Sequence, residues 1–217
     1  MYELPLFPLN TIMFPGMPIN LHIFEERYKK MMNQCIANET PFGVVLIKSG
    51  QEAGSTAVPH SVGCAAYIDQ VQPLRDGRMN MSATGKERFK IHELKHDQPY
   101  LVGVVETLEF DTTMSKDDTV KGWYLKKLVK NYVNVLSTVG NMDVSLENLS
   151  DDPVELAYLT ATLLQAPFSH KQAFLEINAA PELIQTIYGA CRREISILRN
   201  MLDPSVSPNQ EGPFSMN

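Results

Sequence analysis

The sequence predicts an α+β protein with a β-rich N-terminal half and a helical C-terminal half. Up to about residue 115, apolar residues occur in short runs interrupted by Gly, Pro and Asn, which is typical of short strands joined by turns. Beyond that point they recur every three or four residues, which is the spacing of one helix face. We therefore expect a β-rich domain over residues 1–112 and a helical domain over 113–202. Residues 203–217 hold three prolines and few large apolar side chains, which predicts a flexible tail.

The composition narrows the class of protein. Of the 217 residues, 44% are hydrophobic and 20% are charged, which is ordinary for a globular chain. The formal net charge of −6 argues against nucleic acid as a partner, since such surfaces are usually basic. Cys35, Cys64 and Cys191 form no C-x-x-C pair, so we expect reduced, buried thiols and neither a metal nor another cofactor. The N-terminus has no basic n-region and no apolar run reaches about 18 residues, so we expect a cytoplasmic protein without a membrane span.

The β-rich half begins with a segment that proline keeps from being helical. Residues 4–23 contain four prolines, which exclude a regular helix there. Residues 25–36 then predict a helix, because apolar residues recur on one face. That face holds Tyr28, Met31, Met32, Cys35 and Ile36. Apolar or alternating runs predict strands at residues 43–47, 63–74, 79–83, 89–91 and 100–108. Asp76-Gly77 predicts a hairpin turn, and the whole half is expected to form a small barrel or sandwich.

The helical half begins with a long amphipathic helix. Its predicted buried face repeats every four residues as Val120, Tyr124, Leu128, Tyr132 and Leu136. The opposite face carries several lysines and is interpreted as solvated. Asp152, Pro153 and Glu155 predict the capped start of a second helix, and Ser169 with Gln172 predicts a capping box for a third. A last helix follows Pro181, with the apolar stripe Ile184, Tyr188, Cys191, Ile195, Leu198 and Leu202.

One motif suggests metal chemistry. His92-Glu93-Leu94-Lys95-His96 matches the zinc-peptidase pattern H-E-x-x-H, which requires both histidines on one helix face. The flanking residues predict a strand instead, and in a strand residues four apart are separated by roughly 13 Å. One zinc ion, with ligands at about 2 Å, does not bridge that distance. We therefore expect polar residues at a strand end and keep a zinc metallopeptidase as an alternative.

The N-terminal segment carries an ordered series of motifs. It reads LPLFPL at residues 4–9, FPG at 14–16 and LHIFEERY at 21–28. Further motifs follow as FGVV at 42–45, VGCAA at 62–66, DGR at 76–78, GKERF at 85–89 and PYL at 99–101. This series closely resembles the N-terminal substrate-binding domain of Lon proteases, strongly over residues 4–110 and more loosely beyond. We interpret the chain as a stand-alone member without the Lon ATPase and peptidase domains.

The resemblance implies a PUA-like β-barrel followed by a helical bundle. It also implies a non-catalytic module that binds unfolded or extended polypeptide, and it leaves the oligomeric state open. No Walker A motif is present, because Gly85-Lys86 is followed by Glu87, and no G-x-S-x-G elbow occurs. The chain is therefore not expected to be an enzyme.

Four residues of the opening motif are the candidate peptide contacts: His22, Phe24, Arg27 and Tyr28. Loops rich in proline and aromatic residues often line peptide grooves. Structural roles compete with this: Phe24 and Tyr28 as core residues, Arg27 in an ion pair with Glu25, and His22 as a strand-end residue. An RNA-binding module is a further alternative, because PUA-like barrels of other families bind RNA and a local basic patch is available. The patch would comprise Arg75, Arg78, Lys86 and Arg88.

Overall fold

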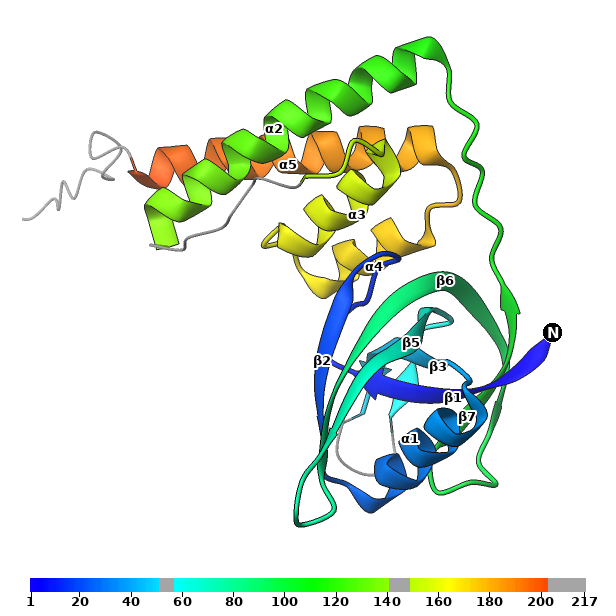
Figure 1. The fold of residues 1–217 in the computed structure, drawn as a ribbon. Helices are drawn as coiled ribbons and strands as arrows, with labels where there is room; N and C mark the ends of the chain where they lie inside the picture. The colour runs from blue at the N-terminus through cyan, green and yellow to red at the C-terminus, as the bar shows by residue number, and fades with distance from the viewer. Residues whose placement is uncertain (51–56, 141–148, 203–217) are drawn as a thin grey trace, which may run out of the picture.

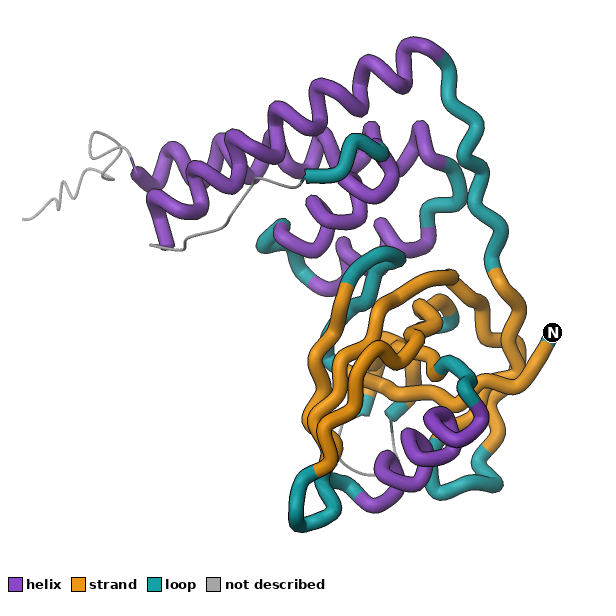
Figure 2. Tube along the Cα trace, in the orientation of Figure 1, coloured by secondary structure: helices purple, strands orange, loops and turns teal. Residues whose placement is uncertain are grey.

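The computed structural model describes residues 1–50, 57–140 and 149–202, and the predicted tail at 203–217 lies outside them. In these residues strands gather in one part of the molecule and the last four helices in the other (Figures 1 and 2), which confirms the α+β class. The strands are β1 (Tyr2–Leu9), β2 (Pro18–Ile23), β3 (Phe42–Ser49), β4 (Val58–Pro59), β5 (Val62–Pro73), β6 (Met79–Lys95) and β7 (Leu101–Thr107). The helices are α1 (Glu26–Asn38), α2 (Lys116–Gly140), α3 (Pro153–Leu163), α4 (Phe168–Glu176) and α5 (Ala180–Leu202).

The sheet pairs in the order β1-β7-β6-β5-β3-β4, and β2 pairs with β6 beside this path. The first strand also pairs in parallel with β3, so the path of hydrogen-bonded neighbours returns to β1. Helix α1 packs Tyr28, Met31, Met32 and Cys35 into the apolar core that the strands surround. Ile36, the fifth residue of the predicted face, is partly exposed because it lies at the margin of that face.

Two details of the β-rich half differ from prediction, and a third is confirmed. The proline-rich segment holds two strands, β1 and β2, that the proline content concealed: Pro5 pairs with Val102 and Pro8 with Val45. The predicted strands at 79–83 and 89–91 are one strand, β6, of 17 residues. Register shifts in its pairing bend this strand, and the local alternation around each shift is what suggested two strands. The predicted hairpin turn is confirmed, with Gly77 at a φ of 78° that favours glycine.

The predicted face of α2 is partly wrong. Val120 and Tyr124 are 51% and 50% exposed, and Leu128 is only partly buried. The buried residues are Leu125, Val129, Tyr132, Val133 and Leu136. A strict four-residue repeat advances about 40° per step around a helix of 3.6 residues per turn. Residues of the predicted stripe therefore move progressively around the helix and leave the buried face. Residues spaced alternately by three and four positions stay on that face.

Of the signals predicted for the other helices, the cap of α3 is confirmed and the capping box of α4 is not. Asp152 caps α3 as predicted, since its carboxylate accepts from the backbone N–H groups of Val154 and Glu155 at 2.7 and 3.2 Å. The predicted stripe of α5 packs into the same core as α2 through Ile184, Cys191 and Ile195. The capping box predicted at Ser169 is wrong. The N-cap of α4 is Pro167, two residues before Ser169, and it forms no side-chain cap.

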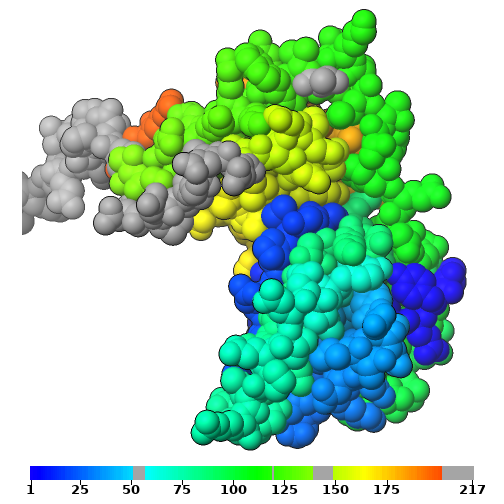
Figure 3. Space-filling model, viewed as in Figure 1, coloured from blue at the N-terminus to red at the C-terminus, as the bar shows by residue number. Residues whose placement is uncertain are grey.

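Arg88, a buried side chain of β6, connects the strands to the helices. Arg88 of β6 donates to the carbonyl oxygens of Leu175 and Ile177 at 2.8 and 2.5 Å, where α4 ends. It also donates to the Glu109 carbonyl and to Asn178 Oδ1, both at 3.2 Å. The segment before β2 adds an apolar contact, because Phe14 stacks on Tyr158 of α3 with ring centroids 5.8 Å apart. Figure 3 shows part of the blue N-terminal region against the yellow helical region. The sequence suggested a basic surface patch that includes Arg88. Because Arg88 is buried, it does not contribute to such a patch.

Replacing Arg88 with Met is expected to lower the free energy of unfolding by at least about 3 kcal/mol, because several buried carbonyl oxygens lose their donor. Arg88→Lys is expected to recover only part of this loss, since an ammonium group does not reproduce the planar fork of donors. Urea denaturation measures both. Arg78→Met is the control, because its ion pair with Asp76 is exposed and is worth at most about 1 kcal/mol. Similar losses at Arg78 and Arg88 would contradict the junction described here.

Leu125→Ala is expected to cost about 2–5 kcal/mol of stability, as for a fully buried leucine. Leu128→Ala is expected to cost less, because that side chain is partly exposed. Lys130→Ala, at an exposed position, is expected to cost under about 0.5 kcal/mol. Thermal and urea denaturation would rank the stabilities of the three variants. A larger loss of stability at Leu128 than at Leu125 would support the predicted four-residue repeat as the buried face.

Candidate functional site

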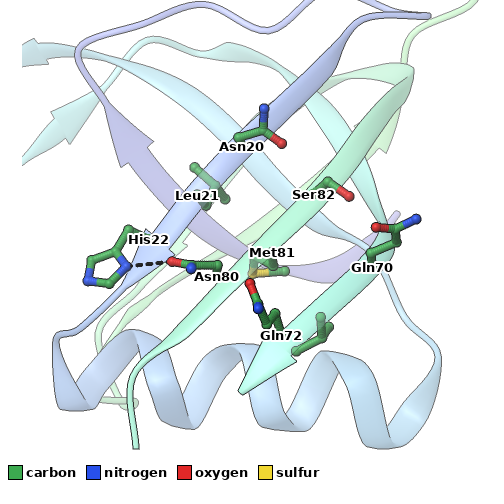
Figure 4. A pocket seen from close by; sticks show the side chains of 9 residues that line it. Asn20, Leu21, His22, Gln70, Gln72, Asn80, Met81 and Ser82 are labelled. Carbon is green, nitrogen blue, oxygen red and sulfur yellow. Dashed lines mark hydrogen bonds between the residues drawn. The ribbon is translucent and has the colours of Figure 1, made fainter. Parts of the chain in front are cut away.

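Three antiparallel strands form a ribbon whose outer face is polar. Residues 79–84 of β6 pair with β2 on one side and with β5 on the other. Because side chains alternate between the faces of a strand, paired residues share a face across all three strands. Two cross-strand rows lie on the outer face (Figure 4). They are His22–Asn80–Gln72 and Asn20–Ser82–Gln70.

The residues between those of the polar rows pack into the apolar core. Met79, Met81 and Ala83 are buried in the apolar cluster around α1, with Leu21 packed against it. A shallow cavity of about 500 Å³ lies along the ribbon and is lined by the two polar rows together with Leu21, Val71 and Met81. The core therefore fixes the strands, and the strands fix the spacing of the polar rows.

The chemistry of this surface is that of the peptide group. Asn and Gln side chains each carry a carbonyl acceptor and an amide donor, and Ser82 adds a hydroxyl that does both. No Asp, Glu, Lys or Arg lines this cavity. Such a surface forms hydrogen bonds with backbone groups and favours neither sign of charge on a ligand.

The ribbon also has an open edge. Within the described residues β2 pairs only with β6, so its other side presents backbone N–H and C=O groups that no strand uses. An unpaired edge of this kind can accept an extended segment as an additional strand.

His22 and Phe24 lie together at one end of the ribbon. His22 Nδ1 is 2.7 Å from Asn80 Oδ1, and Arg78 Nη1 is 3.5 Å from His22 Nε2. The Phe24 ring stacks on the imidazole with centroids 6.1 Å apart, and Phe24 is 60% exposed. Phe24 is therefore not a core residue but a large apolar side chain in solvent beside the polar rows.

Arg27 and Tyr28 line a different cavity, of about 300 Å³, with Pro8, His96 and Tyr100 among its other residues. Tyr28 is buried and meets the Phe7 ring edge-on at 4.4 Å. The Arg27 guanidinium lies 4.3 Å above the Tyr28 ring, and its Nε is 2.9 Å from Glu25 Oε2. These contacts favour structural roles for both residues. The structure thus divides the four candidate contacts into two pairs at different places, His22 with Phe24 and Arg27 with Tyr28.

The H-E-x-x-H motif lies in a strand and the turn after it, as predicted. His92 belongs to β6 and places Nε2 3.0 Å from Glu106 Oε1, whereas His96 follows the end of the strand and lines the second cavity. Within the described part of the chain, no three His, Cys, Asp or Glu side chains are grouped as metal ligands would be.

The cysteines are buried and unpaired. Burial, with a smaller contribution from Glu87, raises the pKa of Cys64 to about 12, and burial likewise raises that of Cys191 to about 12. Burial also raises the pKa of Cys35. A thiol acts as a nucleophile only as the thiolate, so these side chains are poor nucleophiles near neutral pH.

The polar rows were missed by sequence reasoning. Alternation in β5 and β6 was visible in the sequence, but β2 was not predicted, and register between strands is not a local property of a sequence.

None of the described helices has the length and apolarity needed to cross a membrane.

Comparison with known proteins identifies relatives over nearly the whole chain. The profile of the ATP-dependent protease La (LON) substrate-binding domain matches residues 3–190. Lon protease 2 of Myxococcus xanthus is 27% identical over 210 residues, which are 94% of this chain and 25% of that protein. Lon protease of Escherichia coli is 23% identical over 203 residues, which are 91% of this chain and 25% of that protein. The chain thus spans about a quarter of the length of these relatives.

Two solved structures share the fold. The Lon N-terminal domain protein of Xanthomonas campestris superposes with a TM-score of 0.66 and 22% identity, covering 87% of this chain and 98% of that one. The N-terminal domain of the Mycobacterium avium complex Lon protease gives a TM-score of 0.63 and 16% identity, covering 88% and 98%.

The double variant Asn80→Ala/Gln72→Ala is expected to change the free energy of unfolding by under about 1 kcal/mol, because both side chains are exposed. Chemical denaturation checks this. Met81→Ala, one residue along β6 but on the buried face, is the matched comparison and is expected to cost about 2–5 kcal/mol. A reversed order would mean that the two faces of the ribbon are wrongly assigned.

Proposed function

The chain belongs to the ATP-dependent protease La (LON) substrate-binding domain family, and from this premise we propose that it is a non-catalytic module that binds unfolded or extended polypeptide. We propose further that the closed path of strands is a PUA-like β-barrel, which holds the polar ribbon rigid. The module is proposed to act in the cytoplasm, where its three free cysteines remain reduced.

One observation carries the proposal: two rows of amide and hydroxyl side chains lie beside the unpaired edge of β2. An extended segment can add to this edge through backbone hydrogen bonds, which require no particular sequence. The rows offer further donors and acceptors to its peptide groups, and the exposed Phe24 ring offers an apolar contact to its side chains. A folded protein satisfies its own backbone groups, so the surface selects for unfolded chains.

The alternatives gain no support from a specific observation. A zinc peptidase needs His92 and His96 on one helix face, and the strand separates them. An RNA-binding patch needs four exposed basic side chains, whereas Arg88 is buried and Arg78 is paired with Asp76 at 2.6 Å. We therefore propose neither nucleic acid nor membrane as a partner.

The test is titration of the protein with reduced, carboxymethylated α-lactalbumin, which is permanently unfolded, and with native α-lactalbumin as the control. Binding is expected only to the unfolded form and is expected to weaken in Asn80→Ala/Gln72→Ala. Absence of binding at several hundred micromolar, for this and two other unfolded proteins, would refute the proposed function.

Phe24→Ala is expected to weaken binding of the unfolded protein about five- to tenfold, because truncating an aromatic contact typically costs about 1 kcal/mol or more. Phe168→Ala is the matched control. Phe168 is a phenylalanine of α4 with 48% exposure, and its loss is expected to leave the affinity unchanged. Fluorescence anisotropy of labelled substrate measures both variants. Equal effects would show that general surface hydrophobicity, and not this end of the ribbon, drives binding.

A further inference from the structure

A second surface, formed by helices, differs in chemistry from the polar ribbon. Helices α4 and α5 enclose a groove of about 560 Å³ whose lining is mainly apolar. Ala166, Ala173 and Ala190 contribute small side chains, which leave room for large groups from outside. Ile197 and Met201, one turn apart on α5, line the same groove and are 54% and 73% exposed. Single exposed apolar residues are ordinary, but two that border one apolar groove form a contiguous patch of the kind found at interfaces.

Within the described part of the chain, the groove contains one cation without an ion-pair partner. Arg193 lines the groove and is exposed. Among the described residues no carboxylate lies within ion-pair distance of Arg193. The acid of the groove is Glu194, whose carboxylate already accepts from the Tyr132 hydroxyl and from the Gln165 backbone N–H at 2.9 Å. The Arg193 guanidinium is therefore available to pair with an acidic ligand, whereas the Glu194 carboxylate is already engaged.

The walls of the groove also determine the conformation of its ligand. Both walls are helices, whose backbone groups bond within the helix, so the groove presents no strand edge. An extended segment would bring unpaired backbone groups against apolar side chains, which is unfavourable. A helical segment satisfies its own backbone and presents only side chains.

From these features we infer that the groove between α4 and α5 binds an amphipathic helix of a partner protein. Its apolar face packs between Ala173 and Ile197, and an acidic residue on its flank pairs with Arg193. This interaction is separate from the binding of extended polypeptide proposed above, in both its surface and its ligand.

The probe is a synthetic amphipathic peptide of about 18 residues, with leucine at helical spacing and glutamate on the flanks. A peptide with lysine at the glutamate positions is the control. We expect the glutamate peptide to bind at least about tenfold more tightly by fluorescence anisotropy, with an affinity that falls as salt rises. Equal affinity of the two peptides would overturn the inference.

Two variants locate the site. Ala173→Phe fills the groove from an exposed helix position and is expected to abolish binding, whereas Ser169→Phe, on the same helix but outside the groove, leaves it intact. Arg193→Glu is expected to reverse the preference toward the lysine peptide, an outcome that loss of folding does not produce. Binding that survives Ala173→Phe would overturn the inference.

Two further measurements separate this inference from its alternatives. Sedimentation velocity tests for a second copy as occupant, and a dimer that Ala173→Phe dissociates would assign the groove to self-association instead. Titration of Ala173→Phe with carboxymethylated α-lactalbumin is expected to match the unmodified protein. The proposal for the groove and the proposal for the polar ribbon can therefore be refuted independently.

Discussion

The arrangement of strands and helices depends on a buried cation without a carboxylate partner. Arg88 donates only to oxygens that carry partial charge: three carbonyl groups and the side-chain oxygen of Asn178. Two of these carbonyls lie at the C-terminal end of α4, where unpaired C=O groups and the helix dipole both favour a positive charge. Burial lowers the pKa of Arg88, yet a guanidinium starts so high that it stays charged. One side chain thus satisfies a helix end that would otherwise be buried without donors.

The other contacts across this junction follow from the position that Arg88 gives to α4. Gln172 of α4 donates to the Val62 carbonyl of β5 at 3.1 Å. Asp111, in the connection from β7 to α2, forms a bridge with Ala179 just before α5. Phe14 and Val62, from the β-rich half, belong to the same apolar cluster as the helices. The strands and helices consequently share a core, and β6 connects that junction to the polar ribbon within one continuous strand.

How far the sequence predicts this structure depends on the range of each interaction. The turn at Gly77, the cap at Asp152 and the buried face of α1 are set by neighbouring residues, and all three were predictable. The strand β1 was not, because its two prolines oppose a strand locally and only pairing with β3 and β7 holds them in one. Arg88 stood out within the GKERF motif, but its charge suggested a surface patch. Three of its four acceptors lie about 90 residues further along the chain, where no local pattern indicates them. Likewise, the polar rows form only when β2, β6 and β5 pair in the observed register.

The sheet is closed in one part and open in another. Because β1 also pairs with β3, the path from β1 through β7, β6 and β5 to β3 returns to β1. Within the described residues, β2 and residues 67–73 of β5 each pair only with β6. Unpaired edges promote aggregation, and proteins usually cover them, shorten them or place charge on them. Within the described residues, β4 is an outer strand of two residues, whereas β2 presents six with no charged side chain other than a titratable His22. The three-stranded ribbon therefore keeps unpaired edges beside a face of amides, and a purely structural role does not explain this aggregation risk. The proposed binding of transient extended chains would explain it, because the edges must then remain accessible.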